Sequence, residues 1–246
     1  MRNVIWVLAL LCLIHVSKQD LLDPTANLER LVNLQKKATE FLLNKLVFLD
    51  KQTRQNFELK INDIKADTLL NVNKLINEAF ENVNSSIEKG KKEGKNVDEC
   101  YDYAKTNLET KNENANAELE KCIDTANRTI SVPLSNVRKV IEQVKTLMNE
   151  IDAVIPTCRG ESSGIIKLQA CVMKNLYVHG KSLKGLNADA DMIMKNTLFL
   201  YARAITDAKS CTTKLISNTR TFGVDIIVRT DNCVRNAPTD NSTSIY

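Results

Sequence analysis

The sequence has 246 residues and a formal charge of only +4 at pH 7, which argues against the concentrated basic surface that nucleic-acid binding requires. Its 7 glycines and 4 prolines are few enough to favour long helices over sheets. We therefore predict an all-α fold, an elongated bundle of long amphipathic helices.

The N-terminus is typical of a cleaved signal peptide. Arg2 precedes an apolar run at 4–14 that is too short to cross a bilayer, and polar residues follow it. We expect cleavage at 17–19, so that the leader covers 1–19 and takes Cys12 with it; an uncleaved anchor is the alternative. No second apolar run approaches the length of a membrane span. The mature protein is therefore expected to be secreted and extracellular, without stable membrane insertion.

Apolar residues recur at spacings of three and four along 20–89, which predicts an N-terminal helical segment. Asp23 and Pro24 are a typical N-cap and first helical residue. A polar stretch at 50–56 is either a turn or a solvated part of one continuous helix. The predicted stripe before this stretch consists of Leu31, Leu34, Ala38, Phe41, Leu42, Leu46 and Leu49.

A charged stretch with two glycines at 90–96 is predicted to be an exposed linker. A disulfide-stapled helical domain is expected to follow at 97–235. The polar tail at 236–246 is expected to be disordered.

Prolines and glycines predict three interruptions of this second domain. Pro133 is expected to break or kink the helix that contains it. Residues 156–164 contain a proline and two glycines and are expected to form a loop. A short helix from about 162 to 178 is then expected to end at Gly180.

The six cysteines that remain after cleavage include two pairs 22 residues apart, Cys100 with Cys122 and Cys211 with Cys233. Twenty-two residues make about six helical turns, so the cysteines of one pair share a face but lie too far apart to bond to each other. Two such helices packed antiparallel would form a ladder, and the remaining cysteines would close the connection between them. The predicted disulfides are Cys100–Cys233, Cys122–Cys211 and Cys158–Cys171.

Two alternatives to this ladder remain open. Parallel helices would pair Cys100 with Cys211 and Cys122 with Cys233, and a broken helix would allow other pairings. In every case the cysteines are expected to be structural.

Three Asn-x-Ser/Thr motifs agree with export and predict a glycoprotein. Their acceptors are Asn84, Asn127 and Asn241. Asn84 is the weakest candidate because it falls within a predicted regular helix.

The sequence lacks the residues of the common catalytic and metal centres. His179 is the one histidine outside the leader, and the cysteines are assigned to disulfides, so neither a zinc site nor a histidine-based triad can be built. Because it lies beside Gly180, His179 is expected to be solvated or to cap a helix. We predict no enzymatic activity, no catalytic residue, no metal and no cofactor.

The segment around the first two mature cysteines resembles the insect TsetseEP-type domain. Cys100 opens a Cys-Tyr-x-Tyr run, and Cys122 begins a Cys-Ile-Asp-Thr-Ala box 22 residues later. The later four cysteines follow in a similar order, so the resemblance covers about 97–235. The Glu-Pro repeat tail of the founding member is missing. The resemblance implies a secreted helical protein of insect gut, saliva or another secretion, with no catalytic residues to carry over.

Two functional hypotheses follow. The first is a secreted non-enzymatic glycoprotein that acts through surface contacts in a body fluid, with an unknown protein partner or by self-association of its N-terminal helices. The second is a carrier of lipid or other apolar ligands, because amphipathic helices can open and lay their apolar face on lipid. Disulfides across the second half argue against such opening, and a secreted enzyme ranks third. None of these functions involves nucleic acid.

Overall fold

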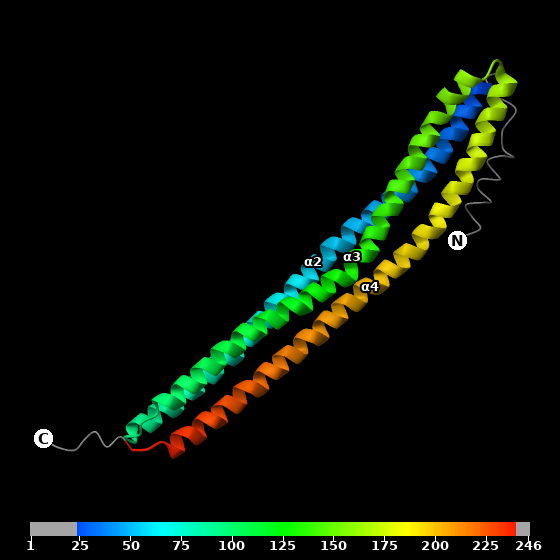
Figure 1. Cartoon of the computed structure of the whole chain (residues 1–246). Coiled ribbons are helices and arrows are strands. Elements are labelled where there is room, and N and C mark those ends of the chain that lie inside the picture. Colours follow the sequence, from blue (N-terminus) through cyan, green and yellow to red (C-terminus); the bar gives the residue numbers. More distant parts are fainter. Residues whose placement is uncertain (1–23, 240–246) are drawn as a thin grey trace. The chain divides into compact units, whose positions relative to one another are not determined.

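Three long helices make up the chain in the computed structural model, which describes residues 24–239 (Figure 1). They are α2 (Pro24–Lys92), α3 (Asp98–Glu161) and α4 (Ile165–Asn236). The predicted all-α class with a disulfide-stapled second half is confirmed. The predicted leader, with Cys12, and the tail residues 240–246 lie outside the described residues. None of the three helices is both long and apolar enough to span a bilayer.

The described chain forms two compact units, and each contains part of all three helices. Unit 1 consists of 24–50 and 135–194, and unit 2 consists of 51–134 and 195–239. These units differ from the division along the sequence into 20–89 and 97–235. The physical reason is that long helices contact their neighbours sideways, so residues far apart in sequence share one core.

In unit 1, α3 runs antiparallel to α2, whereas α4 runs parallel to it. As the residue number increases along α2, that of the ion-pair partner on α3 decreases: Glu29–Arg159, Lys36–Asp152 and Asp50–Arg138. Along α2 and α4 the residue numbers of contacting residues increase together. Gln35 Nε2 donates to the Leu176 carbonyl at 3.1 Å, and Lys45 pairs with Asp191 at 3.1 Å. The unit is therefore an up-down-up three-helix bundle with a two-part apolar core.

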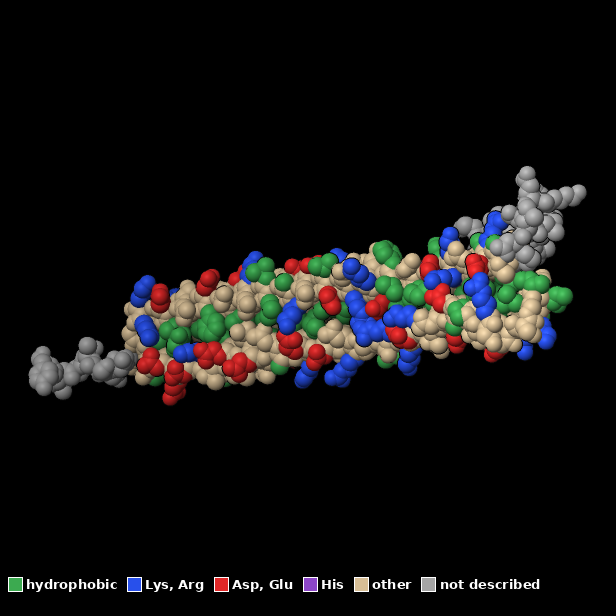
Figure 2. Space-filling model, turned by 90° about the horizontal axis from the view of Figure 1, so that it is seen from above, with side chains coloured by type: hydrophobic (Ala, Val, Ile, Leu, Met, Phe, Trp, Pro, Cys, Tyr) green, Lys and Arg blue, Asp and Glu red, His purple; other side chains and the backbone are tan. Residues whose placement is uncertain are grey.

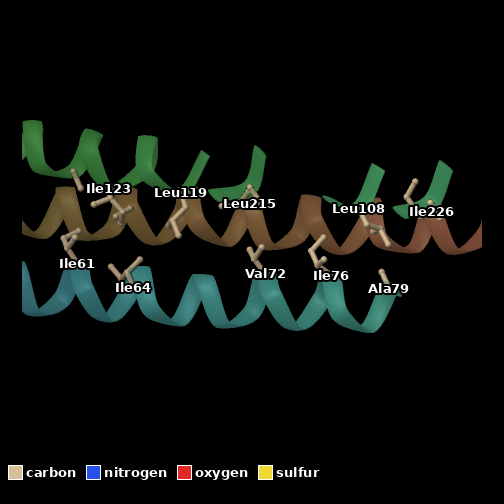
Figure 3. Close-up of a cluster of buried hydrophobic side chains, with 14 of the residues drawn as sticks. Ile61, Ile64, Val72, Ile76, Ala79, Leu108, Leu119, Ile123, Leu215 and Ile226 are labelled. Carbon is tan, nitrogen blue, oxygen red and sulfur yellow. The ribbon is translucent and has the colours of Figure 1, made fainter. Parts of the chain in front are cut away.

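In unit 2, α2, α3 and α4 all contribute to one continuous core (Figure 3). Side chains from α2 point toward side chains of α3 and α4, for example Ile76 with Leu108 and Leu215 in the same cluster. The aromatic ring of Phe57 meets that of Tyr201 edge-on, with centroids 6.2 Å apart. Burial of these apolar surfaces stabilises the bundle by roughly 25 cal/mol for each Å² removed from water.

The polar stretch at 50–56 is a solvated part of a continuous helix, one of its two predicted forms. Thr53 and Phe57 are both buried and continue the spacing of four that begins at Leu49. The stripe is therefore never interrupted, although most residues between these positions face water. An unbroken buried stripe keeps the backbone helical because its packing outweighs weak local propensity.

Helices α3 and α4 continue through Pro133, Pro156 and Gly180, so the loop expected to begin at Pro156 and the helix end expected at Gly180 are wrong. Of the break or kink predicted at Pro133, the break is excluded and the kink stays a prediction. A proline inside a helix removes one backbone hydrogen bond and costs about 3 kcal/mol. Buried side chains on both sides of each proline offset this cost; Ile130 and Leu134 flank Pro133, and Val154 and Cys158 flank Pro156.

The turn between α2 and α3 begins later than the predicted linker at 90–96. Gly90 lies in the last helical turns of α2, and Gly94 has a left-handed φ of 69°. Lys95 N–H donates to the Gly90 carbonyl and Gly94 N–H donates to the Lys91 carbonyl, both near 3 Å. This pair of bonds is the Schellman motif, which satisfies the last carbonyls of a helix and requires a residue such as glycine at the left-handed position.

Replacing either of two glycines with alanine should change the free energy of unfolding, but in opposite directions. A Cβ at Gly90 would lie 2.7 Å from Val234 Cγ1 and 2.8 Å from Val97 Cγ1, whereas a Cβ at Gly185 would meet nothing within 4 Å. Gly90→Ala should therefore lower the free energy of unfolding by about 1–2 kcal/mol through overpacking. Gly185→Ala should raise it by about 0.5–1 kcal/mol, since alanine is the better residue inside a helix.

Urea unfolding followed by circular dichroism would measure both changes. A Gly90→Ala protein as stable as the parent would contradict the close approach of α2, Val97 and Val234.

Candidate interaction surfaces and the disulfide ladder

Two disulfides join α3 to α4 within unit 2. Cys100 bonds to Cys233 with Cα atoms 5.7 Å apart, and Cys122 bonds to Cys211 with Cα atoms 5.9 Å apart. These are the pairs of the antiparallel ladder described above. Cys100 and Cys122 are buried, whereas Cys211 and Cys233 lie on the exposed side of α4. The cysteines of each helix are 22 residues apart, so equal rises along antiparallel helices bring both pairs into register.

The third disulfide, Cys158–Cys171, closes the hairpin between α3 and α4 in unit 1, with Cα atoms 5.7 Å apart. Asn175 lies beside this disulfide, and its side-chain amide donates to the Cys171 carbonyl at 3.0 Å. The same amide also contacts the Cys158 Sγ atom at 3.5 Å. The three residues of the turn that follows α3 are therefore held at both ends, and Gly164 supplies a left-handed φ of 102° before α4 begins.

A groove of about 410 Å³ lies beside the Cys122–Cys211 disulfide in unit 2. Its walls are helical turns of α3 and α4, and the disulfide fixes their separation. Most of the surface exposed to the groove is apolar, although several lining residues besides Leu215 have polar or charged ends: Glu118, Lys121, Thr125, Lys214 and Asn218. The groove combines both signs of charge and gives no preference for a ligand of either sign.

His179 is buried inside α4, so its expected solvated or capping position is wrong. Its Nδ1 atom lies 3.6 Å from the Glu150 carboxylate of α3. The error follows from the expected helix end at Gly180, which the structure replaces with continuous helix. Among the described residues, no group of three His, Cys, Asp or Glu side chains is arranged to hold a metal ion.

Two of the three predicted glycosylation acceptors can be placed. Asn84 and Asn127 are exposed residues within the continuous helices α2 and α3. Asn241 lies outside the described residues. Both placed acceptors face water, which is the position that a bulky glycan requires.

Exposed apolar side chains form a stripe on α2 of unit 1. Leu34, Phe41 and Phe48 follow one another at intervals of seven residues, so they share one face of the helix. Their exposed fractions are 49%, 73% and 65%. We call these three residues the α2 stripe. Figure 2 shows apolar side chains reaching the surface among charged ones on the face in view.

Sequence periodicity placed Leu34 and Phe41 in the core, and the structure corrects this. Residues 31, 34, 38, 41 and 42 fall within about 100° of the helix surface, but the buried face contains Val32 and Thr39 and is centred to one side of that arc, so Leu34 and Phe41 lie outside it. The useful signal was the second periodicity of seven from Leu34 to Phe48, which runs beside the core positions Leu42 and Leu46.

Exposed ion pairs occur in both units, and each contributes little to the free energy of unfolding. Lys36 contacts Asp152 at 2.7 Å, and this hydrogen-bonded carboxylate raises the pKa of Lys36. The same effect operates in unit 2, where hydrogen bonds to Asp225 and Tyr103 raise the pKa of Arg229. Surface pairs of this kind mainly fix the positions of long side chains, since water screens their attraction.

A family model described as a protein of unknown function (DUF725) matches residues 96–215. A search of curated proteins found no match. The matched range begins just before α3 and ends in α4, so it contains Cys100, Cys122 and Cys211 but not Cys233. The chain is therefore similar, over these residues, to a domain family of unknown function.

Removing one of the two disulfides that form the ladder should lower the stability of unit 2. The Cys122–Cys211 disulfide closes 89 residues, and a closed loop of that length lowers the entropy of the unfolded chain. Replacing both cysteines with alanine, while Cys100–Cys233 is kept, should lower the free energy of unfolding by about 4–5 kcal/mol on the loop-entropy account. Guanidinium unfolding without reductant would measure the loss.

The matched control replaces Cys158 and Cys171, which close only 13 residues. Its expected cost is smaller, about 3 kcal/mol on the same account. If either double variant were as stable as the parent, the disulfide concerned would not be constraining the unfolded chain.

Proposed function

We propose that the chain is a secreted, non-enzymatic insect glycoprotein of the TsetseEP type that acts through surface contacts in a body fluid, gut or glandular secretion. Three disulfides support the secreted compartment, because disulfides persist in oxidising environments. The exposed sequon residues Asn84 and Asn127 are compatible with glycosylation there.

The observation that carries the proposal is the α2 stripe. Three large, exposed apolar side chains on one face of a helix are more than the scattered surface apolar residues of an ordinary soluble protein. Their interval of seven residues is the repeat with which one helix packs against another. The stripe therefore fits a helix that carries the same repeat.

We take this partner helix to be α2 of a second copy of the chain. A symmetric dimer places one patch against the same patch of its partner, so a single apolar stripe can serve both sides of the contact. This arrangement would remove Phe41 and Phe48 from water without any change in the bundle core.

Self-association of the full chain tests the proposal. Phe41→Glu with Phe48→Glu should weaken dimer formation on the order of a hundredfold, since two buried phenylalanines would be replaced by charges. Sedimentation equilibrium over a concentration series would measure the dissociation constant.

A matched control introduces the same two charges elsewhere, at Leu198 and Phe199, which are exposed on α4 of unit 2. This control should associate like the parent. A parent protein that remains monomeric at every concentration would refute self-association, and equal effects of the two double variants would remove the stripe from the contact.

A carrier of lipid or other apolar ligands is the second candidate, and the covalent arrangement favours it in one respect. All three disulfides join α3 to α4, whereas α2 contains no cysteine. Apart from the turn at 93–97 that joins it to α3, helix α2 is therefore held to the other two helices by non-covalent contacts. Its buried apolar residues, together with those of α3 and α4, would be exposed to a ligand if α2 moved away.

Native mass spectrometry of protein purified from its source distinguishes the carrier from the first proposal. A carrier should retain apolar ligand in a fixed stoichiometry, and the ligand mass should disappear after organic extraction. A protein that carries no such mass would count against this function and would leave the dimer test unaffected.

A further inference from the structure

The beginning of α4 in unit 1 is strongly basic. Residues 165–188 contain Lys167, Lys174, Lys181 and Lys184, and the first acidic residue of the helix is Asp189. Elsewhere in unit 1 both positive and negative side chains occur along each helix, so this segment differs from its surroundings. Local charge of one sign over six helical turns creates a field that attracts negatively charged surfaces.

Three of these lysines form a single line that points away from the core. Lys167, Lys174 and Lys181 are seven residues apart and therefore lie on one face. The buried residues Val172 and His179 lie on the opposite side of the helix. No ion pair in the described part of the chain uses any of the three lysines, although many other surface lysines have a carboxylate partner.

Apolar side chains accompany the lysines on the same outward face. Ile166, Met173, Tyr177 and Val178 have exposed fractions of 80%, 45%, 66% and 50%. The Lys181 ammonium lies 4.8 Å from the centroid of the Tyr177 ring, so the aromatic side chain and the charge occupy one surface. We call these four apolar residues with Lys167, Lys174 and Lys181 the basic face of α4.

From this combination we propose that the basic face of α4 binds the surface of an anionic lipid bilayer. Lysines flank apolar and aromatic side chains on helices that lie in the plane of a membrane interface. Long lysine side chains can place their ammonium groups among lipid phosphates while isoleucine and tyrosine enter the headgroup region. The binding is peripheral, because none of α2, α3 and α4 could span a bilayer.

A bilayer accounts for this face better than an acidic protein does. An acidic protein partner would be recognised by charge with specific hydrogen bonds, for which arginine is the preferred residue. Every cation of 165–188 is a lysine, and the exposed apolar residues are spread over four helical turns rather than gathered in one pocket. A broad apolar and anionic layer satisfies both features together. This inference does not depend on the proposed dimer, since it uses α4 and not the α2 stripe.

Vesicle co-sedimentation of the full chain tests the inference. The parent should bind phosphatidylcholine vesicles that contain phosphatidylserine, and it should bind pure phosphatidylcholine much more weakly. Lys174→Gln with Lys181→Gln should lower the partition coefficient on the order of thirtyfold, since each lysine near an anionic surface contributes about a factor of five. Binding of the parent should also fall as salt is raised.

The matched control removes two charges from other faces, with Lys139→Gln and Lys209→Gln, which are exposed on α3 and α4. It has the same net charge as the test variant and should bind within about threefold of the parent. Far-UV circular dichroism should show that both variants are as helical as the parent. A third variant, Ile166→Gln with Tyr177→Gln, should weaken binding while all charges are kept.

Three results would overturn the inference. The first is a parent that fails to bind phosphatidylserine vesicles, and the second is a control that loses as much binding as the test variant. In the third, soluble polyglutamate would bind the parent as tightly as the vesicles do, and the face would then recognise negative charge without lipid.

Discussion

The covalent connection of α3 to α4 is the constraint on which the rest of the structure depends. Each of the three disulfides joins these two helices, one in unit 1 and two in unit 2. The pair is therefore a fixed antiparallel platform, and α2 packs on it through apolar contacts and exposed ion pairs. The helices α3 and α4 therefore cannot separate in an oxidising environment, whereas α2 has no disulfide to hold it against them.

The packing of α4 explains how helices with so few large apolar residues stay in register. Many of its buried positions are small, and several carry hydroxyl groups: Ala190, Thr197, Ala204, Ala208, Thr212, Thr219 and Thr230. Thr212, Thr219 and Thr230 donate to the carbonyl four residues earlier, so these buried hydroxyls are satisfied within their own helix. Small side chains allow close approach of the neighbouring helices, and polar core positions favour one register over others.

The sequence predicted the fold class and the ladder geometry because both depend on spacings that an α-helix dictates. The rise of a helix restricts the four cysteines of the ladder to bonds between the two helices, and the structure selects the antiparallel pairs Cys100–Cys233 and Cys122–Cys211 over the parallel ones. The continuity of α3 and α4 could not be predicted in this way, since Pro133 and Gly180 are local signals that tertiary packing overrides. The exposed side of α2 was also missed, because the predicted stripe with Leu34 and Phe41 is offset from the buried face, on which the polar residue Thr39 occupies a core position.

The exposed apolar residues are informative because this type of bundle does not need them. A helix in a three-helix bundle builds its core from about two or three of every seven positions, and the remaining positions face water. Folding therefore places little constraint on the α2 stripe or on Ile166 and Tyr177, and polar residues there would improve solubility. Apolar side chains at positions that folding leaves free require another reason. Two repeats with a spacing of seven residues, one of apolar residues on α2 and one of lysines on α4, point to two contacts with different partners.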